Sequence, residues 1–356
     1  MKVALLMPIY QPSDKVLPFL RTFDPSDFDA FLVVDDGSGE EYKAIFDQVG
    51  ESTPFEVLSY VPNKGKGNAL KTGMKALLEK HPDLDFIITA DGDGQHCLED
   101  IRKVRDEAKN NQGSLLLGSR DFRKKGVPFK SRFGNAFSCF YFSAALHKKI
   151  KDTQTGLRAI PSCLFAIALK TEGNRFEYES NFLLSLRGFP IIEVPIRTIY
   201  EEKGEKRITH FRPIADSLII YKTPLLYILV SVLSFGLDIG LFHIFSTFVF
   251  AEDMAQRVFI SALIARVISG AFNFFMFHFV VFGRKDKIGK SAIKYIILWA
   301  INYGLSSSLT YLFNELPMQL TFIKVIIDII LAILNYLINW TWVFARKKIA
   351  KGKEQK

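Results

Sequence analysis

The first part of the chain alternates short apolar runs with polar stretches of helical periodicity. Five runs have the length and composition of buried strands: Val3–Ile9, Ala30–Val34, Phe55–Tyr60, Phe86–Ala90 and Ser114–Gly118. Three of the intervening stretches predict helices: Asp14–Thr22, Lys66–Lys80 and Leu98–Asn110. The alternation predicts an α/β domain with an open, Rossmann-like, mostly parallel sheet, whose ligands bind at the carboxyl ends of the strands.

From about residue 224 onward, the pattern becomes almost continuously apolar. Four stretches, near 224–250, 257–283, 292–314 and 321–344, each exceed the roughly 20 residues that a helix needs to cross a bilayer. Lysine and arginine gather before the first stretch, between the second and third, and after the fourth, whereas the other two links carry Glu252, Asp253 and Glu315. The positive-inside rule therefore predicts a multi-pass, all-α four-helix transmembrane domain in a cytoplasmic (plasma) membrane, with both termini in the cytoplasm.

These patterns divide the 356-residue chain into four segments. We expect a cytoplasmic α/β domain at residues 1–212, an interfacial linker helix at 213–223, a transmembrane domain at 224–346 and a basic cytoplasmic tail at 347–356. Within the first domain, Phe129–Ile150 carries an aromatic stripe with lysines near its ends. That stripe predicts either a helix lying in the membrane interface or a helix of the core.

The apolar stretches also contain an internal repeat. The segment around Asn273 matches the segment around Asn335, and both end in Val-Phe. Two helix hairpins of similar design are therefore expected. Intramembrane charges need partners, so we expect Arg266 to pair with Asp238, with Asp328 or with both.

Charge and cysteine content narrow the range of partners. The net charge is +9 with 49% hydrophobic residues, and the positive charge is concentrated beside the apolar stretches, which favours a lipid bilayer over nucleic acid. The three cysteines (Cys97, Cys139 and Cys163) lack metal or redox spacing, so free thiols in a reducing compartment are expected. The short run Lys2–Tyr10 is broken by Pro8 and predicts a first strand rather than a signal peptide.

The strongest chemical signal directly follows the strand predicted at Phe86–Ala90. Asp91 and Asp93 stand at alternate positions and are followed by Gln95-His96. Side chains two residues apart in extended backbone share a face, so both carboxylates can address one site. Oxygen ligands of this kind hold Mg²⁺ or Mn²⁺ against a diphosphate and offset its charge while a sugar leaves. The pattern therefore predicts a divalent-cation site for a nucleotide-sugar donor.

Two further segments carry groups suited to a nucleotide. Asp35 and Asp36 end the second strand, where they could accept hydrogen bonds from a base or ribose. For Asp36 an Asx turn that caps the following segment is the alternative. The glycines around Lys64 and Lys66 open a helix, and a helix N-terminus with nearby lysines favours phosphate. The spacing is not that of a Walker A loop.

These motifs resemble glycosyltransferase family 2, whose members are inverting enzymes of the GT-A fold. The resemblance covers most of residues 1–212 and rests on five segments: Met7–Tyr10, Val34–Ser38, Asn63–Gly67, Asp91–His96 and Gly118–Arg120. It implies roles for six residues: Asp93 and Gln95 as metal ligands, Asp91 as a donor or metal contact, Asp35 against the base, and Pro8 and Tyr10 in the nucleotide pocket.

Within that family, one more segment refines the resemblance. The acidic motif followed by Asp152-Thr-Gln-Thr-Gly156-Leu-Arg158 resembles the polyprenyl-phosphate sugar synthases, which include dolichol-phosphate mannose and glucose synthases and bactoprenol glucosyltransferases. The Asp-Thr-Gln form is closer to the glucose-type enzymes, which implies UDP-glucose or UDP-N-acetylglucosamine ahead of GDP-mannose. The Gln-x-x-Arg-Trp motif of processive synthases is missing from the sequence. Residues 224–344 resemble the GtrA-like membrane family.

The acceptor decides which further groups the reaction needs. A lipid phosphate is already anionic and can attack the anomeric carbon without a general base, whereas a hydroxyl acceptor requires one. A phosphate acceptor needs positive charge instead, which arginine supplies in bidentate form. The candidates for this acceptor site are Arg132, Arg197, Arg207, His210 and Arg212. Attraction to anionic lipid is their alternative role. The catalytic candidates are Asp91, Asp93, Arg120, Asp152 and Arg158.

The sequence therefore predicts an inverting, metal-dependent glycosyltransferase. It would move a sugar from a nucleotide-sugar to polyprenyl (undecaprenyl or dolichyl) phosphate for cell-envelope glycosylation. Two alternatives stay open. One is a glycosyltransferase acting on a hydroxyl-bearing glycolipid, and the other is a lipid-linked sugar translocator whose α/β domain is a nucleotide-binding regulator. A homo-oligomer is compatible with the sequence and is not required by it.

Overall fold

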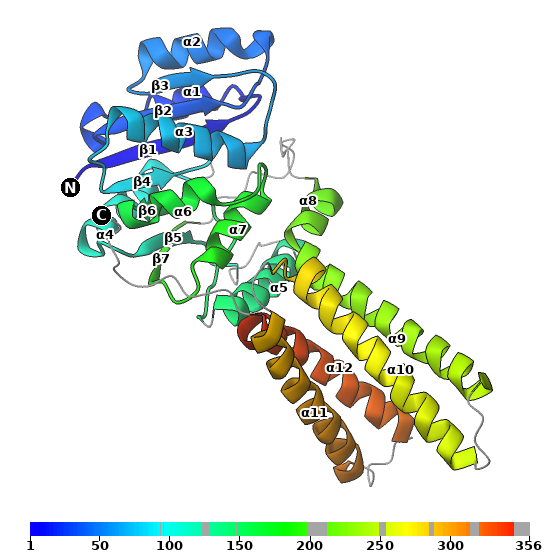
Figure 1. Cartoon of the computed structure of the whole chain (residues 1–356). Helices are drawn as coiled ribbons and strands as arrows, with labels where there is room; N and C mark the ends of the chain where they lie inside the picture. Colours follow the sequence, from blue (N-terminus) through cyan, green and yellow to red (C-terminus); the bar gives the residue numbers. More distant parts are fainter. Residues whose placement is uncertain are drawn as a thin grey trace. The chain divides into compact units, whose positions relative to one another are not determined.

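In the computed structural model of the protein, the apolar runs of the first part form one sheet. Its seven strands among the described residues are β1 (Val3–Ile9), β2 (Ala30–Asp35), β3 (Glu56–Ser59), β4 (Phe86–Thr89), β5 (Leu115–Ser119), β6 (Arg158–Pro161) and β7 (Ile191–Pro195). They are arranged in the order β3-β2-β1-β4-β6-β5-β7 (Figure 1). All neighbouring pairs are parallel except those of β6, which runs antiparallel to β4 and β5. The predicted mostly parallel α/β sheet is confirmed.

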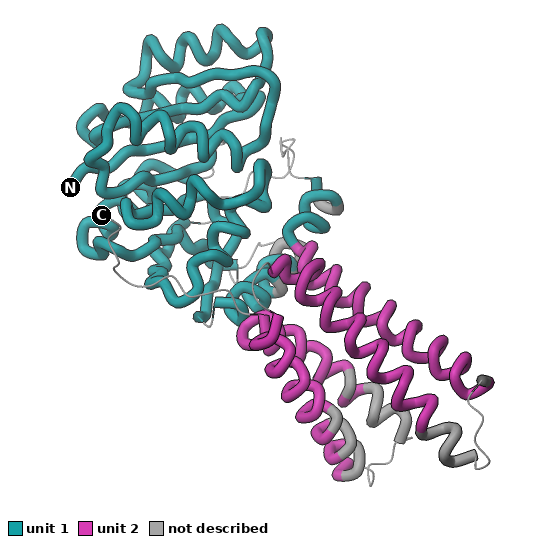
Figure 2. The backbone as a smooth tube through the Cα atoms, in the orientation of Figure 1, with its two compact units in different colours: residues 1–220, 348–356 teal, residues 221–347 magenta. Residues whose placement is uncertain are grey.

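The structure describes residues 1–92, 94, 96–122, 129–146, 148–197, 212–248, 254–284, 288–313 and 320–344. These residues form two compact units, one ending at Ile220 and the other beginning at Tyr221 (Figure 2). The segments expected at 1–212, 213–223 and 224–346 stay a division based on sequence, and the tail at 347–356 lies outside the described residues.

Helices cover both faces of the sheet. Those described in the first unit are α1 (Val16–Leu20), α2 (Lys43–Ser52), α3 (Lys66–Lys80), α4 (Leu98–Asn110), α5 (Phe129–Leu146), α6 (Phe165–Lys170), α7 (Glu177–Ser185) and α8 (Pro213–Ile220), with 3₁₀ turns at Pro25–Asp27, Glu40–Tyr42 and Ser162–Leu164. Successive side chains point to opposite faces of a strand. Leu5 and Met7 of β1 therefore share a core with α1, α2 and α4, whereas Leu6 meets α3 on the other face.

The close agreement between predicted and observed bounds follows from this double coverage. Strands buried on both faces read as continuous apolar runs, and β1, α3 and α4 begin and end at the predicted residues. The predicted helix at Asp14–Thr22 is shorter in the structure, as α1, and the predicted strand at Phe55–Tyr60 is shorter, as β3. Strands β6 and β7 lie outside the five predicted runs. β6 has only four residues and begins with a charged one, so no apolar run marks it.

The predicted aromatic segment forms α5, and the core alternative holds for its second half. Tyr141, Phe142 and Leu146 are buried, whereas Phe140 is 59% exposed. Asn135 binds the carbonyl of Lys151 at 2.9 Å, which ties the helix to the loop before β6. The interface role stays a prediction for the first half, where the side chains of Phe129, Phe133 and Phe137 lie outside the described part.

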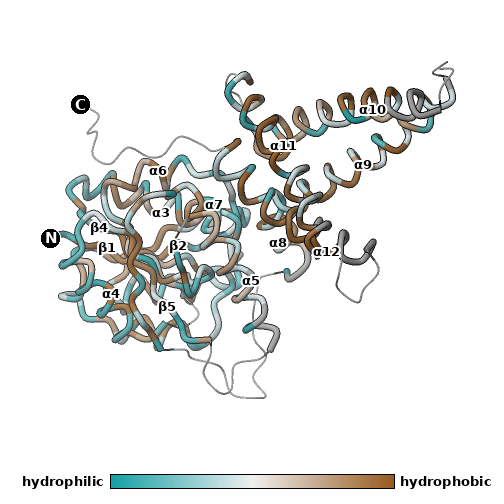
Figure 3. The backbone as a smooth tube through the Cα atoms, turned by 90° about the horizontal axis from the view of Figure 1, so that it is seen from below, coloured by the Kyte–Doolittle hydropathy of each residue, from teal (hydrophilic) through white to brown (hydrophobic). Residues whose placement is uncertain are grey.

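The second unit consists of long apolar helices. In the described part of the chain these are α9 (Lys222–Phe248), α10 (Met254–Met276), α11 (Ile288–Leu312) and α12 (Leu320–Ile338). α9 packs against α10, and α11 packs against α12. Apolar residues run along these helices (Figure 3), and many large ones stay exposed, including Val232, Val267 and Ile296. Apolar exposure on this scale is typical of a surface that a membrane or another protein covers.

Two stretches of the described residues are long and apolar enough to cross a bilayer: Lys222–Thr247 and Ile260–Val281. They coincide with the first two predicted spans, near 224–250 and 257–283. The predicted spans near 292–314 and 321–344 fall on α11 and α12, and a shorter apolar stretch covers Ile329–Val343. The number of four spans and the orientation of the termini stay predictions.

The predicted repeat has a counterpart in the backbone. α10 continues into a π-helical turn at Phe277–Val281, and α12 continues into one at Asn339–Val343. The same sequence offset separates these two turns as separates Asn273 from Asn335. The rings of Phe282 and Phe344, which follow the two turns, stack with centroids 4.9 Å apart. The second helix of each hairpin therefore ends in the same type of backbone turn.

The predicted intramembrane ion pair is confirmed for one partner. Arg266 Nη2 lies 3.3 Å from Asp238 Oδ2, and the hydroxyl of Ser269 donates to Asp238 Oδ1 at 2.8 Å. These contacts join α9 to α10. The side chain of Asp328 lies outside the described residues.

Candidate active site

The carboxyl edge of the sheet carries most of the predicted site residues. Pro8 and Tyr10 lie at the end of β1, Asp35 and Asp36 at the end of β2, Asp91 after β4, Arg120 after β5 and Arg197 after β7. Because β6 runs in the opposite direction, Arg158 at its start lies at the same edge. Strand direction therefore gathers these side chains at the edge where α/β sheets bind ligands.

Asp91 belongs to a chain of alternating charges. Lys66, the first residue of α3, places its Nζ 2.6 Å from Asp91 Oδ1 and 2.9 Å from Glu179 Oε2 in α7. Arg158 Nε lies 3.8 Å from Oε1 of Glu179. On the other side, His96 Nε2 lies 3.5 Å from Asp91 Oδ2. Segments far apart in sequence thus converge on one carboxylate.

The charges of Lys66 and Asp91 stabilise each other. Burial by itself would lower the pKa of Lys66, but the carboxylates of Asp91 and Glu179 outweigh burial and raise that pKa. Burial would raise the pKa of Asp91, but Lys66 and His96 hold it well below its ordinary value. Both side chains are therefore ionised near neutral pH. The Asp91 side chain is 31% exposed, so a charged carboxylate is open to solvent at the strand edge.

Gly156 permits the position of Asp91. A β-carbon on Gly156 would lie 2.5 Å from both Cγ and Oδ1 of Asp91, closer than non-bonded atoms approach. The Thr89 hydroxyl donates to the Gly156 carbonyl at 2.9 Å, which fixes this glycine against the end of β4. The sequence shows Gly156 only as part of a motif, because its contact with Asp91 depends on the pairing of β4 with β6.

The predicted metal ligands Asp93 and Gln95 lie outside the described residues. Within the described part, no three or more His, Cys, Asp or Glu side chains gather as a metal site. The remaining member of the predicted set, Asp91, nevertheless fits a divalent cation. It offers a charged, solvent-open oxygen, which is the ligand type that Mg²⁺ and Mn²⁺ prefer.

The two aspartates after β2 stabilise neighbouring backbone. Asp36 is 2% exposed, and its carboxylate accepts hydrogen bonds from the Tyr60 hydroxyl, the Asn63 amide and the backbone N–H groups of Lys64 and Gly65. Its carboxylate is thus engaged within the protein, which favours an anchoring role over hydrogen bonding to a nucleotide. Asp35 Oδ1 accepts from the Ser38 N–H at 2.9 Å, and its assignment to the base stays a prediction.

The glycine-rich segment packs against protein. Gly65 has a φ of +95°, and a β-carbon there would lie 2.7 Å from Arg175 Cγ. The N–H of Asn68 donates to the Asn174 carbonyl at 3.0 Å, so the start of α3 rests on the loop before α7. Lys64 is exposed with its ammonium 5.1 Å from the centre of the Tyr60 ring, whereas the ammonium of Lys66 contacts the two carboxylates described above.

Asp152 and Arg120 form a buried ion pair. The Asp152 side chain is wholly buried and accepts four hydrogen bonds: from Arg120 Nε at 2.7 Å, Arg120 Nη2 at 3.2 Å, the Arg120 N–H at 3.2 Å and the Gln154 N–H at 3.1 Å. Glu193 of β7, which the sequence did not single out, braces the same loop. It accepts from the Lys151 N–H at 2.7 Å and the Ser119 hydroxyl at 3.1 Å.

Arg158, a predicted catalytic residue, binds the main chain of two neighbouring segments. It is 2% exposed, and its guanidinium donates to the carbonyls of Thr155 at 3.0 Å and Glu179 at 2.9 Å. It therefore joins the loop before β6 to α7. Glu179, like Glu193, was not predicted from the sequence, because an acidic residue within a polar helix carries no distinguishing signal.

The predicted acceptor-site residues lie on separate elements. Arg197 is exposed and pairs with Glu99 at 2.9 Å, and Arg132 is exposed on α5. The N–H of Arg212 donates to Asp216 Oδ2 at 2.7 Å, at the start of α8. Arg207 and His210 lie outside the described residues. The assignment of this set to the acceptor phosphate stays a prediction.

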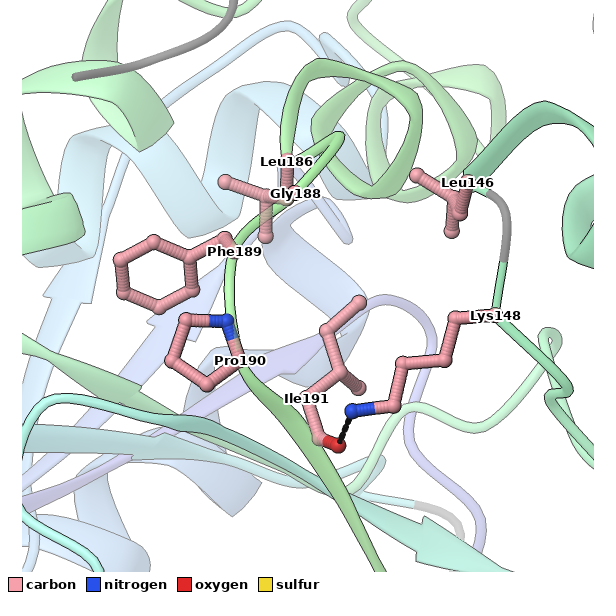
Figure 4. A pocket seen from close by; sticks show the side chains of 7 residues that line it. All are labelled: Leu146, Lys148, Leu186, Gly188, Phe189, Pro190 and Ile191. Atoms are coloured by element: carbon pink, nitrogen blue, oxygen red, sulfur yellow. Dashed lines mark hydrogen bonds between the residues drawn. The ribbon is translucent and has the colours of Figure 1, made fainter. Parts of the chain in front are cut away.

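The structure also contains a pocket of 240 Å³ (Figure 4). It opens at the beginning of β7, the end of that strand opposite to Arg197. The residues that line it are Leu146, Lys148, Leu186, Gly188, Phe189, Pro190 and Ile191. The Lys148 ammonium binds the Ile191 carbonyl. The charged groups that could act on a phosphate ester lie at the other edge, so this pocket is not the candidate active site.

Fold and site together define a membrane-attached glycosyltransferase with a GT-A-like domain. The chain belongs to glycosyl transferase family 2, whose model matches residues 6–170, and it carries a GtrA/DPMS transmembrane domain at residues 216–344. It is thus an enzyme and a membrane protein.

Several relatives match more than half of this chain. An uncharacterised protein of Methanocaldococcus jannaschii is 31% identical over 59% of this chain and 88% of its own length. The UDP-N-acetylglucosamine–dolichyl-phosphate N-acetylglucosaminyltransferase of Methanococcus voltae is 28% identical over 58% of this chain and 90% of its own length. The undecaprenyl-phosphate mannosyltransferase of Micrococcus luteus is 26% identical over 59% and 88%, respectively.

Proposed function

We propose that the enzyme transfers a sugar, with inversion, from a nucleotide-sugar to polyprenyl phosphate. The relatives that act on dolichyl phosphate and undecaprenyl phosphate support this acceptor. One of them uses UDP-N-acetylglucosamine, which supports a UDP-sugar donor, with UDP-glucose and UDP-N-acetylglucosamine as the first to test. The second unit would hold the enzyme in the membrane where this lipid resides, with the site on the cytoplasmic side.

The observation that supports a phosphate acceptor is the burial and hydrogen bonding of the Asp152 carboxylate. A general base needs a lone pair directed at the proton that it removes. Asp152 is buried and accepts four hydrogen bonds within the protein, so it does not offer one. A phosphate acceptor needs no base, since its oxygen is already anionic. In the proposed reaction this oxygen attacks the anomeric carbon, the bond from that carbon to the diphosphate breaks, and the nucleoside diphosphate leaves with the bonding electrons.

The donor diphosphate would be held at the strand edge beside Asp91. Mg²⁺ or Mn²⁺ bound by Asp91, Asp93 and Gln95 would supply the positive charge that the leaving diphosphate needs. Arg120, fixed by Asp152, follows β5, which runs parallel to β4 on the other side of β6, and its guanidinium lies at the same edge. The exposed Arg132, Arg197 and Arg212 remain the proposed contacts of the acceptor phosphate, together with Arg207 and His210.

The test is sugar transfer by the full-length protein in detergent. Undecaprenyl phosphate is incubated with radiolabelled UDP-N-acetylglucosamine, UDP-glucose or GDP-mannose, with and without Mn²⁺. Label should enter the lipid fraction with one donor, and it should be lost without the cation and in Asp93→Ala. The matched control is Asp47→Asn, an exposed aspartate of α2, which should keep full activity.

Asp152→Asn separates the acceptor classes. Loss of a general base lowers turnover by about 10²- to 10⁴-fold at saturating substrate. Loss of a structural anchor should lower the thermal midpoint and change turnover of the remaining folded enzyme far less. Absence of lipid label with every donor, despite measurable nucleotide binding, would contradict the proposal and favour a hydroxyl acceptor or a translocator.

A further inference from the structure

Lys66 does not present a free ammonium to a ligand. Its Nζ stands 2.6 Å from Asp91 and 2.9 Å from Glu179, and its side chain is only 18% exposed. Two carboxylates that share one ammonium are each oriented by it, because moving either one lengthens a charge-assisted hydrogen bond. The position of Asp91 is therefore set by a contact with α3 as well as by its own backbone.

Glu179 is the anchor of this arrangement. Its side chain is 11% exposed, and its main-chain carbonyl accepts from the buried Arg158 at 2.9 Å. Lys66 is in turn fixed at its backbone, since the segment that opens α3 packs on the loop before α7 through Asn68 and Asn174. Side chain and main chain thus hold Lys66 between the two carboxylates.

We propose that Lys66 and Glu179 form a positioning pair that holds the Asp91 carboxylate in place for the donor diphosphate and its cation. Asp91 contacts the ligand, Lys66 orients Asp91, and Glu179 orients Lys66. The inference rests on the proposed nucleotide-sugar site but not on the identity of the acceptor. It differs from a direct contact between Lys66 and phosphate, in which Glu179 would only weaken the attraction of the ammonium for an anion.

The two models predict opposite effects for Glu179→Gln. This change keeps the size of the side chain and removes one negative charge from the surroundings of the diphosphate. If Lys66 bound phosphate directly, nucleotide affinity would rise. If Lys66 positions Asp91, the ammonium loses one of its two anchors, the carboxylate is less well fixed, and affinity falls.

The experiment is calorimetric titration of the full-length protein in detergent with UDP and with GDP, each in the presence of Mn²⁺. The nucleotide that the wild type binds is then used for Lys66→Met, Lys66→Arg, Glu179→Gln and the double variant Lys66→Met/Glu179→Gln. We expect affinity to fall at least tenfold in Lys66→Met and about threefold in Glu179→Gln, with partial recovery in Lys66→Arg. Because both residues act on one carboxylate, the double variant should bind about as weakly as Lys66→Met alone.

Lys71→Met is the matched control. Lys71 lies five residues further along α3. Its ammonium binds the Gly173 carbonyl at 2.8 Å and lies over the ring of Tyr178. It braces the same loop without touching Asp91, so it should retain wild-type affinity. Equal losses of nucleotide affinity in Lys71→Met and Lys66→Met would show that Lys66 only stabilises the loop before α7. Tighter nucleotide binding by Glu179→Gln would overturn the positioning model. Should the wild type bind neither nucleotide, the proposed function itself fails, which is a distinct result.

Discussion

Gly156→Ala tests whether the packing of the Asp91 carboxylate controls the reaction. The added carbon would lie 2.5 Å from Asp91 Cγ, and ordinary contact begins near 3.4 Å, so the carboxylate must move by about 1 Å. The backbone itself does not oppose alanine, since Gly156 is not among the positive-φ glycines. A shift of about 1 Å in a reacting group costs about 100-fold in rate, which corresponds to about 2.7 kcal/mol of transition-state stabilisation.

The assay is kcat/KM for label transfer to undecaprenyl phosphate, with the thermal midpoint measured in parallel. Overpacking should also lower stability by about 1–3 kcal/mol, so activity is compared at a temperature where the variant is folded. Gly50→Ala is the matched control. Gly50 lies in the last turn of α2, and its added carbon would meet only Val57 Cγ2, at 3.9 Å. That control should be as active and at least as stable as the wild type. A kcat/KM within about twofold of wild type for Gly156→Ala would refute the reasoning.

Two further predictions concern charges outside the site. Burial would raise the pKa of Asp27, but Arg102, which binds it through two hydrogen bonds, lowers it below the ordinary 3.8. A lowered folded-state pKa adds stability above the unfolded-state value and loses it as the pH falls. Asp27→Asn should therefore lower the thermal midpoint at neutral pH and flatten its decline between about pH 5 and about pH 3, and an unchanged decline would contradict this. In the second unit, Arg266→Leu leaves Asp238 without its guanidinium partner and should reduce the amount of folded protein in membranes, whereas Arg266→Leu/Asp238→Leu should recover it. Equal yields of all three proteins, measured by size-exclusion chromatography in detergent, would show that the pair does not stabilise the helices.

Much of the architecture could be predicted because it depends on local patterns. β1, α3 and α4 are found at the expected residues, since buried runs and helical periodicity are properties of consecutive positions. The ion pair of Arg266 with Asp238 was predicted because an intramembrane charge without a partner is costly. β6 was not predicted, since four residues beginning with arginine have neither the length nor the pattern of a strand.

The sequence predicted which residues lie at the carboxyl edge of the sheet and only some of their contacts. The motif that contains Asp91 stands at a strand end, and its neighbours in sequence already indicate an anionic ligand and a cation. By contrast, Lys66 was expected at a phosphate and lies between two carboxylates, and Asp36 was expected at a nucleotide and holds the segment after β3. Each of these contacts involves a partner distant in sequence: Glu179 for Lys66, and Tyr60 with Asn63 for Asp36.

The sequence by itself determined the α/β domain, the apolar helical region and the acidic motif at the strand edge. Hydrophobic periodicity, and the residue types that follow a strand, are properties of residues close together in the sequence. Only the tertiary structure decided which charges meet. The antiparallel entry of β6 between β4 and β5 sets Gly156 against Asp91, Asp152 against Arg120, and Arg158 against Glu179. Contacts of this kind depend on strand order and direction, which no local pattern specifies.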